Sequence, residues 1–238
     1  MSDIEEHYSV NVDKIKIENS KSKKLLGIKI YNKMAFNEHV SDICAKASQK
    51  LHALSRISNY MTLLQRQITM RSFILSQFGY CPLVWMFHSR KLNNRINRIH
   101  ERGLRIVYKD LRSSFTELLK KDESFTIHER NIQTLGIELY KVVNGYSPKI
   151  ANLIFPLNPN CKYPGENDFM TRNVKNVGSG TETLAHLGPK IWTLIPITIK
   201  KSKSLYTFRK EIRKWKPEKC PCRLCKIYVK DIGFVEIR

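Results

Sequence analysis

The sequence is poor in acidic residues and has no long apolar run. It contains 21 Asp and Glu against 42 Lys and Arg, which gives a formal net charge of +21 at pH 7. Such an excess says little about the fold, but it favours a polyanionic partner, most often nucleic acid. The longest nearly apolar run, Phe78 to Phe87, is far shorter than the roughly 20 residues of a membrane-spanning helix. The sequence therefore indicates no membrane association.

Signals for export and for catalysis are also missing. The acidic and polar start over residues 1–7 differs from the basic and apolar start of a secretory signal peptide. We therefore expect an intracellular protein, nuclear or cytoplasmic and not secreted, with reduced cysteines. The sequence has no Asp-Asp pair, no G-x-x-x-x-G-K and no H-E-x-x-H. Since a two-metal site needs clustered carboxylates, we expect that this chain is not an enzyme.

The spacing of apolar residues predicts a mainly α fold. Residues 1–33 contain two short alternating runs with a polar turn between them, which indicates a β-hairpin too small to be stable alone. From Asn37, a plausible N-cap, the spacing becomes helical, and a helical bundle that resembles a polymerase thumb is expected over residues 34–155.

Several local signals divide this bundle into helices. Thr62 and Ser114 each begin the four-residue pattern of a capping box. Pro82 is expected to bend or end the helix that Thr62 opens. Further helices are expected over about 91–109 and 127–143.

The C-terminal part is expected to form a separate, smaller unit. Residues 156–187 are rich in proline and glycine and are interpreted as a long connecting loop. A basic unit follows over residues 188–238, with one helix starting at Pro189. A second, amphipathic helix is expected over 204–214.

Seven cations recur along the third helix at alternating steps of four and three, which places them on one face. They are Lys91, Arg95, Arg98, Arg102, Arg105, Lys109 and Arg112. Such a row can follow the phosphates of RNA or DNA. Most charge runs are solvated faces without a partner, and on charge alone both interpretations stay open.

A second group of cations lies on the helix near the C-terminus. Its members are Arg209, Lys210, Arg213 and Lys214. Aromatic residues are interleaved with them, as in proteins that bind single-stranded nucleic acid. Phe208 and Trp215 are better explained as the core face of that helix, whereas the cations are expected to contact nucleic acid.

Three closely spaced cysteines, Cys220, Cys222 and Cys225, form a C-x-C-x-x-C motif. Three thiolates at this spacing can hold zinc, which needs a fourth ligand in a tetrahedral site. By sequence, Cys161 and His186 are the nearest candidates for that ligand. The alternative is a reduced cluster without metal.

Six segments, spread in order over nearly the whole chain, resemble sequence motifs of one known protein family. They are Lys24–Ile28, Ser76–Met86, His88–Asn93, Ile96–Arg102, Leu187–Trp192 and Cys220–Lys226. Together they resemble the C-terminal region of reverse transcriptases from jockey- or CR1-like non-LTR retrotransposons of animals. The resemblance implies that the first segment closes the palm, that the following helices form the thumb, and that the rest is a C-terminal extension.

The family's Tyr-x-Asp-Asp metal-binding motif is absent from this sequence. Polymerase activity therefore does not carry over, whereas nucleic-acid contact by the thumb does. The resemblance implies a primer–template duplex or element RNA as the partner, with no small-molecule substrate. Two alternatives stay open: a repurposed protein-interaction module, and a non-functional remnant of an element.

Overall fold

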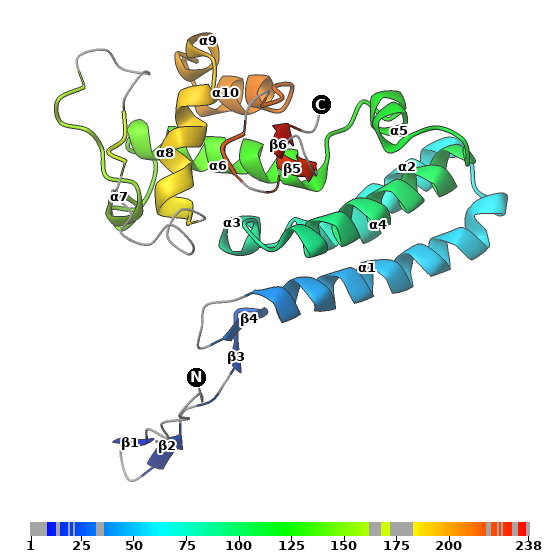
Figure 1. Ribbon diagram of the computed structural model, residues 1–238, viewed down its shortest axis with the longest axis horizontal. Coiled ribbons are helices and arrows are strands. Elements are labelled where there is room, and N and C mark those ends of the chain that lie inside the picture. The colour runs from blue at the N-terminus through cyan, green and yellow to red at the C-terminus, as the bar shows by residue number, and fades with distance from the viewer. Residues whose placement is uncertain are drawn as a thin grey trace.

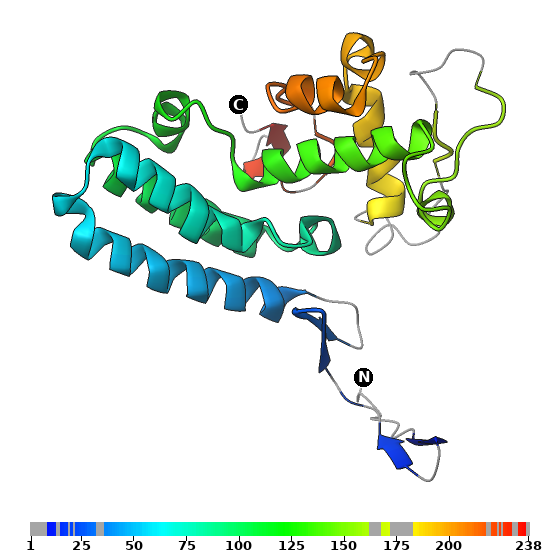
Figure 2. The ribbon, with the colours of Figure 1, turned by 180° about the vertical axis from the view of Figure 1, so that it is seen from behind.

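Two groups of helices and an N-terminal β-structure make up the fold. The computed structural model describes residues 9–12, 15–18, 20, 22–31, 36–161, 168–171, 183–217, 220–222, 224, 226–229 and 233–236. In Figure 1, α1 and α4 lie in one group, α6, α8 and α10 form the other, and the N-terminal strands extend away from both. The view from behind in Figure 2 shows the same division. The mainly α fold with N-terminal β-structure is confirmed.

The N-terminal strands form two hairpins, whereas the sequence predicted one. They are β1 (Ser9–Val12), β2 (Ile15–Glu18), β3 (Ser22–Leu25) and β4 (Ile28–Tyr31). β1 pairs with β2 and β3 with β4, both antiparallel, so each alternating run folds back on itself. In the second hairpin Leu26 and Gly27 have φ values of 47° and 84°. Two positive φ values are what a two-residue hairpin loop needs to match the twist of its strands.

The first buried core lies between the long helices and the segment that joins them. Its elements are α1 (Asn37–Ile57), η1 (Ser58–Tyr60), α2 (Leu63–Thr69), η2 (Met70–Ile74), η3 (Leu75–Phe78), α3 (Pro82–Trp85) and α4 (Arg90–Tyr108). Phe36 rather than Asn37 is the N-cap of α1, without a side-chain cap. The capping box at Thr62 is confirmed. The helix it opens changes to a π-helical turn in η2 and a 3₁₀ turn in η3, and Pro82 then begins α3.

Helix α4 passes close to this core at Gly103. A Cβ atom on Gly103 would lie 2.1 Å from Met70 Cε and 2.5 Å from Met70 Sδ. Although glycine lowers helix propensity, α4 continues through this residue without a break. The missing side chain makes room for the thioether of Met70.

The second core lies between helices from both predicted units. Its elements are α6 (Ile127–Val143), α7 (Ala151–Ile154), α8 (Leu184–Leu194), α9 (Ile197–Lys200) and α10 (Leu205–Ile212), with α5 (Phe115–Lys121) beside α4. The ring of Phe208 stacks on Tyr140 with a centroid distance of 4.1 Å and lies 6.2 Å from Trp192. The buried apolar residues of α6 from Ile132 onward therefore share a core with residues 188–224, although the sequence placed α6 in the unit 34–155. The expected core role of Phe208 is confirmed, and Trp215 packs against the same core.

The connection before α8 is shorter than the predicted loop over 156–187. α8 begins at Leu184 after the N-cap Thr183, so Pro189 lies inside the helix and not at its start. Proline has no backbone N–H, so α8 lacks one hydrogen-bond donor at Pro189. The helix is buried along one side. Leu157 and Phe169 form an isolated antiparallel bridge within this connection. Residues 162–167 and 172–182 lie outside the described part of the chain.

One hairpin lies after the cysteine motif. It consists of β5 (Lys226–Val229) and β6 (Gly233–Glu236), which pair antiparallel. Within the ranges given above, no helix is both long enough and apolar enough to cross a membrane.

Candidate metal centre and basic surfaces

The first turn of α6 fixes the position of His128. Thr126 and Glu129 form a capping box, in which Thr126 N donates to Glu129 Oε2 at 2.8 Å and Glu129 N donates to Thr126 Oγ1 at 3.2 Å. Ile127, at the first helical position, is buried in the first core. Because both neighbours of His128 are held, its imidazole has a defined direction.

The chain that follows α10 runs back along α6 toward this turn. Gln133 Nε2 donates to the carbonyl oxygen of Trp215 at 2.9 Å. One turn earlier on α6, Glu129 Oε1 lies 3.2 Å from Lys216 Nζ. These two contacts bring Cys220 and Cys222 to the N-terminal end of α6.

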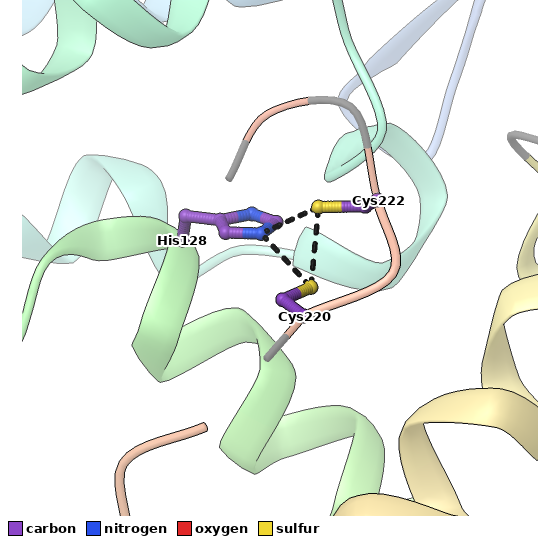
Figure 3. Close-up of side chains that lie close together, drawn as sticks. All are labelled: His128, Cys220 and Cys222. Carbon is purple, nitrogen blue, oxygen red and sulfur yellow. Dashed lines mark hydrogen bonds between the residues drawn. The ribbon is translucent and has the colours of Figure 1, made fainter. Parts of the chain in front are cut away.

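Three buried side chains meet there, as Figure 3 shows. The Nε2 atom of His128 lies 3.1 Å from Cys222 Sγ and 3.9 Å from Cys220 Sγ, and the two sulfur atoms are 3.2 Å apart. Cys220 is 5% exposed and Cys222 is fully buried. The two cysteines are not joined in a disulfide.

This donor set fits a zinc ion. Zinc prefers thiolate sulfur and imidazole nitrogen, and metal–ligand bonds of 2.0–2.3 Å in a tetrahedron separate neighbouring ligand atoms by about 3.3–3.8 Å. The three separations of 3.1, 3.2 and 3.9 Å lie around that interval. His128, Cys220 and Cys222 can therefore bind a metal ion without a large rearrangement.

Two of the three predicted cysteine ligands, Cys220 and Cys222, belong to this group, and Cys225 lies outside the described residues. His128 supplies the distant ligand that the motif required, whereas Cys161 and His186 are not part of the group within the described ranges. Cys161 Sγ instead donates to Asp168 Oδ1 at 3.8 Å. No local signal marks His128, because its partners lie more than 90 positions away in the sequence.

A second histidine lies close to the triad. The Nδ1–H group of His88 donates to the carbonyl oxygen of Trp85 at 2.9 Å, and its Nε2 atom is buried without a hydrogen-bond partner. Burial lowers the pKa of His88 to about 4, and His128 and Cys222 are near enough to influence that pKa. His88 is therefore neutral at neutral pH and adds no positive charge beside a bound cation.

The third predicted helix presents a continuous cationic face. We define the α4 row as Lys91, Arg95, Arg98 and Arg102, which are all exposed on α4. None of the four makes an ion pair with any residue that the structure describes. The core contacts of α4 come from Leu92, Ile96 and Ile99, so the buried face is separate from the row.

The row is shorter than the sequence predicted. Arg105 is half-buried and forms an ion pair with Glu101 at 2.7 Å. Lys109 has a φ of 52° and caps the helix, and Arg112 follows beyond its end. The prediction of one helical face over 91–112 is therefore wrong beyond Tyr108, because Lys109 leaves the right-handed conformation.

The cations of the C-terminal helix are exposed in the structure. They are Arg209, Lys210, Arg213 and Lys214. The last two follow the end of α10 at Ile212, and Lys214 Nζ lies 3.4 Å from Glu211 Oε1.

Comparisons with family models, with curated proteins and with solved structures found no match to this chain. The function is therefore argued from the residues and their geometry.

Proposed function

We propose that this chain binds the phosphate backbone of nucleic acid through the α4 row. The observation that carries the proposal is the exposure of four cations on one face of a helix whose other face is fixed in a core. Neighbouring members are three or four residues apart, which corresponds to about 4.5–6 Å along the helix axis. Because they have no ion-pair partners in the described residues, they repel one another, and a polyanion relieves that repulsion.

The family resemblance supports the same function. We propose that the chain corresponds to the end of the palm, the thumb and the C-terminal extension of a jockey- or CR1-like reverse transcriptase. A primer–template duplex or element RNA is then the partner. We propose no polymerase activity for this chain, since its sequence lacks the paired aspartates that would hold two metal ions.

We also propose that His128, Cys220, Cys222 and Cys225 hold a structural zinc ion. The first three are brought together by the fold, and Cys225 follows from the motif alone. Four protein ligands leave no open coordination position, which is typical of structural and not of catalytic zinc. The ion would link the segment after α10 to the start of α6 and so stabilise the second core.

A salt titration of duplex binding tests the nucleic-acid proposal. The test variant replaces Lys91, Arg95, Arg98 and Arg102 by Gln. The matched control replaces four exposed lysines elsewhere, Lys24, Lys120, Lys149 and Lys190, by Gln. Both variants lose the same net charge, so a difference between them reports the position of the cations and not the total charge.

The α4 variant should bind both primer–template and unrelated duplexes more weakly than wild type does. The loss of affinity should be the same for both, because phosphate contacts do not read sequence. Its slope of log affinity against log salt should become shallower by about 0.9 for each lost contact with B-form DNA. The control should keep the wild-type slope. Equal slopes in all three proteins would contradict the proposal. Binding to a protein partner with little salt dependence would favour the interaction module instead.

A further inference from the structure

A cavity of about 520 Å³ lies between the two groups of helices. Three arginines line it from three different elements: Arg71 from η2, Arg130 from α6 and Arg213 from the end of α10. We call it the arginine cavity. Its volume lies in the usual range of small-molecule sites, and Phe125 and Ile137 add an apolar part to its wall.

One of the three arginines is already neutralised. Arg71 Nη2 lies 3.3 Å from Asp122 Oδ1, and the same oxygen accepts a hydrogen bond from Tyr108 at 2.8 Å. The Asp122 side chain is only 5% exposed, and its Oδ1 atom accepts from both donors. Arg71 and Asp122 thus form one wall of the cavity with little net charge.

Arg130 is different, because no hydrogen bond or ion pair joins its guanidinium to any residue in the described ranges, although Asp122 and Glu129 are near enough to influence its pKa. Burial is the main cause that lowers the pKa of Arg130. Arg130 is half-buried, and a charged group that loses part of its hydration without gaining a partner raises the free energy of the fold. An anion in the cavity would remove that cost.

Two further groups are free to bind the same anion. Ser124 lines the cavity, and its Oγ atom is buried without a hydrogen-bond partner. Arg213 has an exposed side chain that makes no hydrogen bond or ion pair with the described residues, whereas its backbone N–H donates to Arg209 O at 3.4 Å and its carbonyl oxygen accepts from Gln133 Nε2 at 3.3 Å. The cavity therefore offers two uncommitted guanidinium groups and one hydroxyl donor, and its lining also includes the exposed Glu123, whose carboxylate opposes part of that positive charge.

We propose that the arginine cavity binds a phosphate monoester group, with Arg130 and Arg213 as its charged ligands and Ser124 as a hydrogen-bond donor. A monoester carries a charge of about −1.5 to −2 at neutral pH and so matches two free cations, whereas a carboxylate or a phosphodiester carries only one charge. The planar guanidinium group also binds two phosphate oxygens at once. The monoester comes from a free nucleotide or from the phosphorylated end of a strand. This site uses no member of the α4 row, so the two proposals can fail separately.

Calorimetry with the full chain tests the proposal. The probes are adenosine 5′-monophosphate, adenosine, and one short oligonucleotide with either a 5′-phosphate or a 5′-hydroxyl. The variants are Arg130→Gln, Arg130→Lys and Arg213→Gln. Arg209→Gln is the matched control. Arg209 is exposed on α10, one turn before Arg213, but it does not line the cavity.

The monophosphate should bind and adenosine should not, and the two oligonucleotides distinguish a strand end from a free nucleotide. Arg130→Gln and Arg213→Gln should each weaken monophosphate binding by about tenfold or more, and Arg130→Lys should restore part of it. If Arg130→Gln fails to fold, Arg213→Gln still tests the proposal, because Arg213 is exposed. The α4 quadruple variant should bind the monophosphate as wild type does. Dissociation constants above about 1 mM for every phosphorylated probe, or equal affinities for Arg213→Gln and Arg209→Gln, would overturn the proposal.

Discussion

The Nε2 atom of His128 lies 3.1 Å from the Sγ atom of Cys222, although 94 positions separate the two residues in the sequence. His128 belongs to the first turn of α6, and Cys222 belongs to the segment that follows α10. The distance between them is therefore set by the complete second core. Metal binding at such a site is coupled to folding, because the unfolded chain does not bring the ligands together.

Zinc content is the first prediction. Protein purified without chelators should contain about one zinc ion per chain. His128→Asn, Cys222→Ser and Cys225→Ser should each weaken zinc affinity by about 100-fold or more, since even outer-shell changes commonly cost 10–100-fold. Elemental analysis and competition with a chromogenic chelator measure this.

Two controls define the ligand set. His52→Asn changes an exposed histidine of α1 and should leave the zinc content unchanged. His88→Gln should also keep the metal, because His88 is not within the triad. Loss of zinc in His88→Gln together with retention in Cys225→Ser would show that His88, and not Cys225, is the fourth zinc ligand. Less than about 0.2 zinc per wild-type chain would remove the site altogether.

Acid should destabilise the fold through His100. This residue is fully buried, and burial lowers its pKa to about 3. An unfolded histidine has a pKa near 6.5, so below that pH the unfolded state takes up a proton that the folded state does not. The free energy of unfolding should therefore fall by about 1.4 kcal/mol for each pH unit between about 6.5 and 3.

His100→Leu should remove this part of the pH dependence. Both ring nitrogens of His100 are buried without a hydrogen-bond partner, so leucine leaves no polar group orphaned. Denaturant unfolding at pH 6.5 and pH 4.5 should show a smaller loss in this variant than in wild type. His88, with its pKa lowered to about 4, maintains a similar dependence in both proteins. An identical loss in wild type and His100→Leu would show that His100 takes up its proton in the folded state.

Gly188→Ala should destabilise the second core. A Cβ atom at Gly188 would lie 2.5 Å from Cε1 of Phe155, whose buried ring contacts Phe169 and cannot easily move. Overpacking of this kind typically costs about 1–3 kcal/mol. Gly79→Ala is the control, because its new Cβ would lie 3.5 Å from the nearest atom. A normal denaturation midpoint for Gly188→Ala would mean that the ring shifts without cost.

Arg66 should contribute strongly to the first core. This arginine is 8% exposed and donates to the carbonyl oxygens of Val107 and Met61 at 2.7 Å and of Ser58 at 3.3 Å. Arg66→Met removes the side-chain donor of these carbonyl groups, of which Ser58 O keeps the Met61 N–H at 3.4 Å, and we expect a loss of about 3–5 kcal/mol in the free energy of unfolding. Arg56→Met, on the exposed side of α1, should change it by less than about 0.5 kcal/mol.

Local signals in the sequence predicted the elements that depend on neighbouring residues. The capping boxes at Thr62 and Ser114 are present, and α6 has the predicted bounds, since these features depend on contacts within four residues. The interpretation of Pro189 failed, because proline at a helix start and proline inside a buried helix give the same local pattern. The sequence predicts one hairpin where the structure has two, because a single glycine such as Gly27 within an apolar run does not distinguish a turn from a continuing strand.

Relationships over long distances could not be read from the sequence. The apolar face of α6 predicts burial but does not say against which helices. Likewise, nothing near His128 indicates cysteines as its neighbours, and the total charge does not distinguish the exposed Arg102 from the buried Arg66. The motif did predict that a distant ligand was needed, and only the tertiary structure identifies it.

The two larger buried cores give the protein an order of assembly during synthesis. Every residue of the first core lies at or before Ile127, so it can close while the ribosome is still translating the rest of the chain. The second core includes Cys220, Cys222 and Leu224, which are translated more than 90 residues after Ile127. Until they emerge, the apolar side of α6 lacks part of its partner surface. This helix is therefore a region of the nascent chain that a chaperone can protect, and the emergence of residues 220–224 ends that need.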